Sequence, residues 1–297
     1  MNWQAIKDEN EVNILSQYSE SGWFLTISYI MYIVIAASAY SLLPMVPVLL
    51  DMIDPLNETR PRFYIFGGEY FIVDNVEDYG KVYAFELVSA AVTAWLICAV
   101  DSMYAASIEH CLGLLAIVKL RLQMCTQPSC DSRKDVSYRL IVQLIRLHKD
   151  IIKFSIGVDL LFTDILESSY SSSFLILVGI NVLFLSFECI IVLTRFGQLM
   201  ELMRYSMIMV GIVVHLFYLS WPGQKLTDLS IGLFQDAYLN EWYTCSTRAQ
   251  KLLGLMILRC SKPCQLTAGG IYVMNFSNFA KIVKTSMSYM TVLASFR

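Results

Sequence analysis

The sequence predicts an all-α protein, a bundle of helices that cross a membrane. Three observations support this fold class: the composition, long apolar segments almost without charge, and the basic residues gathered between them. Of the 297 residues, 56% are hydrophobic and only 16% are charged, and the mean hydropathy is +0.55. Soluble domains are about 45–50% apolar and about one quarter charged, so a lipid bilayer is the expected surroundings of this chain.

Four segments are long and apolar enough to cross the hydrocarbon core, which takes about 20 residues of helix. They lie at about 22–50, 83–108, 171–193 and 205–221. The tail from about 276 to 296 is a fifth and weaker candidate, because it carries two lysines and several hydroxyl groups. We therefore expect five membrane helices.

Other segments have apolar residues at helical spacing outside these spans. They are LLAIVKLRLQM after the second span, YRLIVQLIRLHKDIIKF before the third, and TRAQKLLGLMILR, which Pro263 stops. We expect the membrane helices to extend into the cytosol and to pack there; the alternative is that these are only juxtamembrane helices. The expected organisation is a transmembrane bundle over 1–224 that includes a cytoplasmic helical segment at 109–168, cytoplasmic anchor helices at 225–270, and a C-terminal helix at 271–297.

The basic residues predict the orientation, because cytoplasmic loops carry an excess of Lys and Arg. Eight Lys and Arg residues lie in 109–168 and five between 222 and 275, whereas 51–82 holds three among many acids. The N-terminus is therefore expected inside and the C-terminus outside. The sequon Asn57-Glu58-Thr59 lies in the loop assigned outside, so Asn57 is a candidate glycosylation site. The sequon at Asn275 lies where no glycan is expected.

Several function classes find no support in the sequence. The pairs Cys125/Cys130 and Cys260/Cys264 are too widely spaced for a C-x2-C metal motif, and no histidine lies near them in the sequence. We expect no metal and no cofactor. There is no nucleophile–base spacing and no phosphate loop, so an enzyme is not expected. The net charge of -3 and the lack of a basic motif argue against a nucleic-acid partner.

The last helix has two different faces when it is drawn at 100° per residue. A polar face, about 120° wide, holds Lys281, Lys284, Thr285, Ser288, Thr291, Val292 and Ser295. Polar groups at membrane depth are costly and usually face the protein interior or water. The pattern favours a helix that lines an aqueous path, with Val292 and Phe296 as an apolar constriction. Two alternatives stay open: packing against other polar helices, or an amphipathic helix on the membrane surface.

The residues from 258 to 296 resemble the C-terminal signature of the insect odorant receptors, within the insect chemoreceptor superfamily. Ser288-Tyr289-Met290-Thr291-Val292-Leu293-Ala294-Ser295-Phe296 is similar to the Thr-Tyr, five apolar residues, Gln-Phe motif of that superfamily. Upstream, LRCSKPCQLTAGGIYVMNFSNFAKIVKTSMSY follows the family's order of Arg, Pro, Leu-Thr-Ala-Gly, Phe and Ser-Tyr. The stretches NEVNILSQYSESGWFLT, VDSMYAASIEHCLG and FYLSWPGQKLTDLS are also family-like, so the resemblance covers the whole chain.

The resemblance implies a seven-helix subunit of an odorant-gated, non-selective cation channel. It implies a heteromeric tetramer with the odorant co-receptor, held together by cytoplasmic anchor helices, in the plasma membrane of olfactory sensory neurons. It also implies a pore lined by the last helix, with a hydrophobic gate at Val292 and Phe296 and a polar ring at Ser295. Ser295 stands where the signature has Gln and Ser288 where it has Thr, so the resemblance carries no detailed statement on ion selectivity.

The family has two membrane helices before the segment that corresponds to 22–50. By this comparison the chain is expected to be an N-terminally truncated member that lacks the first two. Two other functions stay open, a fragment of a G-protein-coupled-type receptor and a non-conducting truncated subunit. The first usually has a disulfide from an external loop, and 45–82 contains no cysteine.

The resemblance also implies that volatile odorants bind in the outer half of the helical bundle. The residues that the sequence places there at helical spacing are Ala36, Tyr40, Phe85, Ser89, Val92, Tyr205 and Met209. They fit a pocket that is mainly apolar and aromatic. Ordinary helix packing explains such residues equally well.

Three ionisable residues lie within or near membrane depth, namely Asp101, Glu188 and His215. Such groups are functional candidates by default, but Asp101 and Glu188 lie toward the ends of their spans, where solvation costs less. We expect structural hydrogen bonds for all three. Trp242 is a candidate packing residue of the anchor helices.

Overall fold

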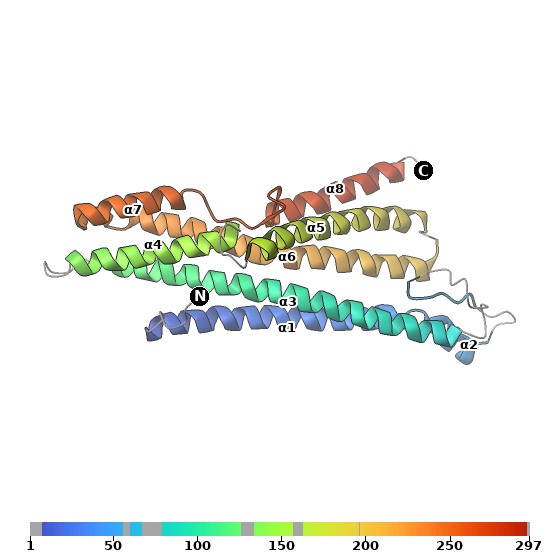
Figure 1. The fold of residues 1–297 in the computed structure, drawn as a ribbon. Helices are drawn as coiled ribbons and strands as arrows, with labels where there is room; N and C mark the ends of the chain where they lie inside the picture. The colour runs from blue at the N-terminus through green and yellow to red at the C-terminus, as the bar shows by residue number, and fades with distance from the viewer. Residues whose placement is uncertain are drawn as a thin grey trace. The chain divides into compact units, whose positions relative to one another are not determined.

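The computed structural model describes residues 8–55, 60–66, 79–125, 134–156, 163–195 and 197–295. Within this part the regular secondary structure is helical apart from one short hairpin, which confirms the all-α fold class (Figure 1). The elements are α1 (Glu9–Leu42), α2 (Met45–Ile53), α3 (Tyr79–Cys125), α4 (Lys134–Ile156), α5 (Thr163–Thr194), α6 (Leu199–Leu239), the 3-10 helix η3 (Trp242–Thr244), α7 (Thr247–Cys260), β1 (Thr267–Ala268), β2 (Tyr272–Val273) and α8 (Phe276–Ser295).

Among the described residues, four helices are long and apolar enough to cross a membrane. They are α1, α3, α6 and the Ser173–Val192 part of α5. They match the four strong spans that the sequence predicts. Helix α8 forms over the predicted tail but is not among the four, so its crossing of the membrane stays a prediction.

The first predicted span, 22–50, is not one continuous helix. Helix α1 ends at Leu42, Pro44 is the N-cap of α2, and the chain turns through the bond from the Leu43 amide to the Tyr40 carbonyl. Proline has no N–H to donate to the preceding turn, so the helix breaks where Pro44 would have to continue it. The sequence pattern of uncharged residues does not reveal this break.

Helix α6 differs from expectation in the opposite way, because it continues through Pro222 to Leu239. The predicted span ends at 221. Beyond the proline, Leu226 and Leu233 are fully buried. Their packing outweighs the hydrogen bond that Pro222 removes from the helix.

The chain divides into two compact units, each built from segments that are distant in the sequence. Unit 1 comprises Met1–Phe24, Tyr104–Leu183 and His215–Thr285, and unit 2 comprises Leu25–Met103, Phe184–Val214 and Ser286–Arg297. Helices α1, α3, α5, α6 and α8 contribute residues to both.

The core of unit 1 lies where four helices bury their apolar faces. Helices α4 and α7 lie side by side in this unit (Figure 1). The fully buried side chains of this core include Leu115, Ile117, Leu122, Ile141, Leu144, Leu226, Leu233 and Leu253. The segments after the second span, before the third span and over 247–259 are thus helices that pack in this core, and their cytoplasmic location stays a prediction. Trp242 is half-buried against this core, as expected for a packing residue.

Between α4 and α7 the ring of His148 is buried, with its Nε2 atom 3.9 Å from the Sγ atom of Cys260. Burial, with a smaller contribution from the nearby Arg259 charge, lowers the pKa of His148 to about 4. Burial likewise raises the pKa of the Cys260 thiol to about 12. Both groups are therefore uncharged at neutral pH, which agrees with a closely packed apolar contact.

Among the described residues, the ion pairs that join helices in unit 1 include two with a buried carboxylate. The guanidinium of Arg121 donates two hydrogen bonds to the carboxylate of Glu11, at 2.6 and 2.7 Å. The ammonium of Lys225 lies 2.9 Å from Glu109, whose side chain is only 2% exposed. Such paired, hydrogen-bonded geometry is the usual condition for burying a carboxylate.

A tight hairpin leads from α7 into α8 (Figure 1). Gly269 and Gly270 have φ angles of 61° and 66°, which L side chains adopt at a cost, so the predicted break at Ala268-Gly269-Gly270 is a hairpin turn. The Oδ1 atom of Asn275 then accepts a 2.8 Å hydrogen bond from the Asn278 amide and caps α8.

The first turn of α8 is held against α6 by an aromatic cluster. The rings of Phe217 and Phe276 stack with centroids 5.5 Å apart, and Trp221 and Phe279 pack edge-on to this pair. Gly223 lies directly against the carbonyl group of Met274 and leaves no room for a Cβ atom. This contact fixes where α8 begins in unit 1.

Candidate functional site

In unit 2, a short segment without regular secondary structure is held by contacts with four helices. We call this segment, residues 60–66, the strap. Ile65 in the strap is only 1% exposed, and its amide donates a 2.6 Å hydrogen bond to Oε2 of Glu86 in α3. The carbonyl of Ile65 accepts from the hydroxyl of Tyr40 in α1 at 3.0 Å and from Nη2 of Arg204 in α6 at 2.8 Å. The main chain at Ile65 thus connects α1, α3 and α6.

Arg204 has further contacts at this point. Its Nε atom donates to the Tyr40 hydroxyl at 3.2 Å. Its guanidinium also lies over the rings of Phe63 and Tyr205, 5.9 and 5.7 Å from their centroids. Hydrogen bonds to charged groups and cation–π contacts both strengthen where water is excluded, so Arg204 is a central support of the strap.

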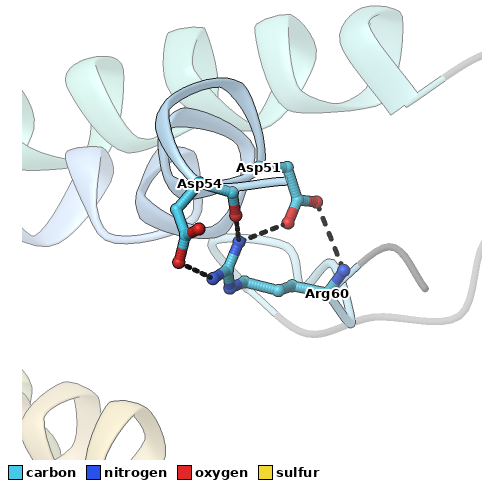
Figure 2. A network of polar contacts seen from close by, with 3 residues as sticks. All are labelled: Asp51, Asp54 and Arg60. Atoms are coloured by element: carbon cyan, nitrogen blue, oxygen red, sulfur yellow. Dashed lines mark hydrogen bonds and ion pairs between the residues drawn. The ribbon is translucent and has the colours of Figure 1, made fainter. Parts of the chain in front are cut away.

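The start of the strap is tied to the end of α2, as Figure 2 shows. The Nη1 atom of Arg60 lies 2.7 Å from Oδ1 of Asp51 and 3.0 Å from the carbonyl of Asp54. The Arg60 amide also donates to Oδ2 of Asp51 at 3.2 Å. Because side chain and main chain of Arg60 share one carboxylate, the strap begins at a defined position.

Tyr79, the first residue of α3, supports the middle of the strap. Its hydroxyl lies 3.1 Å from the carbonyl of Pro44 and 3.2 Å from that of Phe63. The Arg62 guanidinium lies over the Tyr79 ring at 5.4 Å, and the Tyr64 ring stacks on it at 5.3 Å. The strap is therefore held by polar and aromatic contacts along its length.

The predicted odorant-binding residues fall into two groups in unit 2. Tyr40 and Tyr205 meet at Arg204, where Tyr40 bonds to the strap, and both are half-buried, as are Ala36 and Met209. Phe85 and Val92 are 66% and 51% exposed, and Ser89 lies on the same face of α3 with its hydroxyl bonded to the Phe85 carbonyl. That face points away from the side on which α3 buries Glu86, so the structure does not bring the seven residues together.

A groove of about 430 Å³ lies in unit 2 between α1 and α3, and none of the predicted residues lines it. Small side chains form much of its wall, with Trp95 at one side. Its lining residues are Ile30, Ile33, Val34, Ala37, Ser38, Ala91, Ala94, Trp95, Cys98, Ala99 and Ser102. The groove is mainly apolar and is large enough to be a small-molecule site.

The expected structural roles of the intramembrane ionisable residues are met for two of the three. Tyr29 donates a 2.6 Å hydrogen bond to Asp101, and both side chains are buried in unit 2. His215 is hydrogen-bonded to Asn181 in unit 1, at 3.3 Å. Glu188 is 8% exposed, and its Oε2 atom has no hydrogen-bond partner within the described residues.

The polar face of α8 is exposed along the described helix. Its members Lys281, Lys284, Thr285, Ser288, Thr291, Val292 and Ser295 are all exposed, Val292 by 52%. The hydroxyls of Thr291 and Ser295 donate to carbonyls one turn earlier, at 2.9 and 2.7 Å. The predicted gate residue Phe296 and the sequon residue Asn57 lie outside the described residues.

Sequence reasoning missed Glu86 and Arg204 as residues of this region. A charged side chain within the apolar run Ala84-Phe85-Glu86-Leu87-Val88 was the available signal. Nothing in the sequence around Glu86 identifies Ile65 as its partner, because the strap is a different segment of the chain. Across the described residues no cluster of His, Cys, Asp and Glu could hold a metal ion.

Comparison with known proteins identifies the family. The family model for the 7tm odorant receptors matches residues 1–287. The chain belongs to this family. The assignment confirms that it is a membrane helical bundle of the insect odorant receptor type and not an enzyme.

Relatives include odorant receptor 10 of Aedes albopictus, 27% identical over 61% of this chain and 46% of that receptor. Odorant receptor 49a of Drosophila melanogaster is 21% identical over 69% of this chain and 47% of its own length. Odorant receptor Or2 of Anopheles gambiae is 24% identical over 65% of this chain and 50% of its own length. The chain thus spans about half the length of the curated relatives it matches.

Solved structures of the olfactory receptor OR5 from Machilis hrabei have the same fold. The complex with eugenol matches with a TM-score of 0.70 at 14% identity, over 95% of this chain and 70% of that chain. A second structure of the same receptor matches with a TM-score of 0.67 at 15% identity, over 95% of this chain and 69% of that chain. At this level of identity the match shows the fold of the chain and nothing further.

Proposed function

We propose that this chain is a subunit of an odorant-gated, non-selective cation channel in the plasma membrane of olfactory sensory neurons. The N-terminus faces the cytoplasm and the C-terminus the outside, with α8 crossing the membrane and lining the pore. The observation that carries this proposal is the exposed polar face of α8 in a chain of the odorant receptor family. A membrane helix with hydroxyl and ammonium groups along one face needs water or a polar partner on that side.

Val292 is the one apolar member of that face and is the proposed gate, together with Phe296 and the polar neighbours Ser288, Thr291 and Ser295. Its side chain is 52% exposed within the chain. A ring of such side chains in the assembled channel would exclude water from a narrow passage, which is how hydrophobic constrictions close pores.

Assembly with the odorant co-receptor as a heteromeric tetramer is supported by the outer face of α7. Leu255 and Leu258 are 64% and 69% exposed, although the opposite face of α7 is buried in unit 1. Arg248 and Lys251 lie on the same exposed side. An apolar centre with a charged rim is typical of protein–protein interfaces, so α7 is the proposed anchor contact between subunits.

Volatile odorants are proposed to bind in unit 2, which contains the strap. Two places there are the candidates: the surroundings of the half-buried Tyr40, Tyr205 and Met209, and the mainly apolar groove beside Trp95. Substitution Ala94→Trp fills the groove, and Tyr205→Ala removes a ring near Arg204. A shift in odorant sensitivity caused by only one of them shows which place is occupied.

The experiment that tests the function is a current recording from cells that express this chain with the odorant co-receptor. We expect an odorant-evoked cation current, and we expect Val292→Ala to leak at rest or to shift gating. Met287→Ala is a matched control, because Met287 is 53% exposed but lies on the other face of α8. Equal behaviour of the two variants contradicts the gate, and the absence of any current that depends on this chain contradicts the channel function.

A further inference from the structure

Charge is distributed very unevenly along this chain. The last 56 residues, after Glu241, contain seven Lys and Arg residues and no Asp or Glu. The whole chain has 22 basic and 25 acidic residues, so the first 241 residues carry 15 basic against all 25 acidic ones. The hairpin and α8 therefore lie in a segment whose own charges are all positive.

Within α8 the positive charge is on the polar face. Lys281 and Lys284 are both exposed and share this face with Thr285, Ser288 and Ser295. By the predicted orientation, they stand one to two turns from the cytoplasmic end of the helix. Any ion that passes along the polar face would pass these two ammonium groups.

The contact that Lys281 makes within the described residues leaves its charge in place. Its ammonium donates to Oδ1 of Asn278 at 3.3 Å. The side-chain Nδ2 atom of Asn278 donates a 2.9 Å hydrogen bond to the Val273 carbonyl, and this bond orients Oδ1 toward Lys281. Asn278 is neutral, so this hydrogen bond positions the ammonium without compensating its charge.

We propose that Lys281 and Lys284 set a positive potential at the cytoplasmic end of the pore and thereby lower the passage of divalent cations relative to monovalent ones. This inference rests on the proposed pore-lining role of α8. The electrostatic work of entering a positive potential is proportional to the charge of the ion. A potential that lowers the local Na⁺ concentration by a given factor therefore lowers that of Ca²⁺ by the square of the factor.

Lysines near the inner end of a membrane helix also occur as anchors that reach lipid headgroups. Here both lysines lie on the face that carries the hydroxyl groups. The opposite face offers Phe279, Ile282 and Val283 to an apolar environment. A helix with these two faces places its lysines toward water and its apolar side chains toward lipid or protein, which favours the pore.

The first test measures ion selectivity in the chain expressed with the odorant co-receptor. We expect the double variant Lys281→Gln/Lys284→Gln to raise the Ca²⁺ to Na⁺ permeability ratio, from reversal potentials, by about two-fold or more. The arginine double variant keeps the charges and should keep the ratio. Lys262→Gln is the control, because Lys262 is also exposed but lies in the segment between α7 and β1. An unchanged ratio in the glutamine variant overturns the inference.

The second test needs no current. Thr285→Cys, in membrane vesicles open to solution, is labelled with an anionic and a cationic methanethiosulfonate reagent, and the parent chain gives the background from native cysteines. We expect the anionic reagent to react faster than the cationic one. The ratio of the two labelling rates should fall by about two-fold or more when Lys281→Gln and Lys284→Gln are also present, and it should decrease in high salt.

The outcomes of the labelling separate the inference from the proposed function. Labelling at a rate ratio that does not depend on the lysines overturns their role and leaves the pore intact. Failure of both reagents to reach Thr285→Cys means that this face meets lipid or protein. That result overturns the inference and the pore-lining role together.

Discussion

Arg204 and Ile65 are 139 positions apart in the chain, yet Nη2 of Arg204 donates a 2.8 Å hydrogen bond to the Ile65 carbonyl. The same carbonyl accepts from Tyr40, and the Ile65 amide donates to Glu86. In unit 2, one buried residue of the strap thus meets side chains from α1, α3 and α6. The first two predictions test how much these hydrogen bonds contribute to the stability of unit 2.

Replacement of Arg204 by Gln should loosen the strap. Charge-assisted hydrogen bonds contribute about 1.5–3 kcal/mol each, so we expect a clear loss of thermal stability in detergent. Trypsin should also cut faster after Arg62 in the strap, whereas Pro61 protects the bond after Arg60. The control is Arg195→Gln, which removes an ion pair with Glu201 that is about half exposed and should change little. Equal cleavage rates in wild type and Arg204→Gln would contradict the assigned role.

Glu86 should tolerate replacement by Gln far better than replacement by Leu. Glutamine keeps an oxygen that can accept from the Ile65 amide, whereas leucine leaves that buried N–H without a partner. An unsatisfied buried donor costs about 1–3 kcal/mol. Thermal unfolding of both variants, measured side by side, checks the difference. Similar unfolding temperatures for Gln and Leu would show that the hydrogen bond has little weight.

Gly223→Ala should destabilise unit 1 although alanine is the better helix former. The added Cβ atom would collide with the Met274 carbonyl, and overpacking of this kind costs about 1–3 kcal/mol. Gly211→Ala is a matched control in the same helix, because a Cβ atom there has nothing within 4 Å. We expect a lower yield of monodisperse protein for Gly223→Ala and none of this loss for Gly211→Ala. A lower yield for Gly211→Ala than for Gly223→Ala would contradict the close contact between Gly223 and the Met274 carbonyl.

Stability should fall as the pH drops from about 6.5 toward 4, because of His148. The folded state lowers the pKa of His148 to about 4, whereas the unfolded chain has a value near 6.5, so the unfolded state binds more protons in this window. Protonation then favours unfolding, and the stabilisation present above pH 6.5 is lost on acidification. We expect His148→Gln to flatten the dependence of the unfolding temperature on pH between 7 and 5. If wild type and His148→Gln show the same dependence of the unfolding temperature on pH, the assigned role of His148 is wrong.

Much of the fold follows from composition and spacing. The four strong spans and the helices around 134–156 and 247–260 follow from apolar residues at helical spacing, and Gly269-Gly270 marks the turn before α8. The break at Pro44 and the continuation through Pro222 do not follow in the same way. Both depend on what the proline meets in the folded chain: a turn at Pro44, and a buried core beyond Pro222.

The site was predicted less completely, for a physical reason. Tyr40 and Tyr205 were named because they lie at helical spacing with Ala36 and Met209 in the outer halves of their spans. Periodicity does not tell which helices face one another, so the contact of both tyrosines with Arg204 could not be predicted. The strap and its partners Glu86 and Arg204 are joined by contacts between distant segments. Such pairing depends on tertiary packing, which a single sequence leaves open.

The central claim is that α8 crosses the membrane and lines a pore, and the position of the C-terminus tests it most directly. An epitope after Arg297 should be stained on intact cells that express the chain, while a tag at Met1 should be stained only after permeabilisation. Staining of the C-terminal tag without permeabilisation is the predicted result. If surface delivery is proven and the C-terminal tag is seen only in permeabilised cells, α8 does not cross and the pore assignment is wrong.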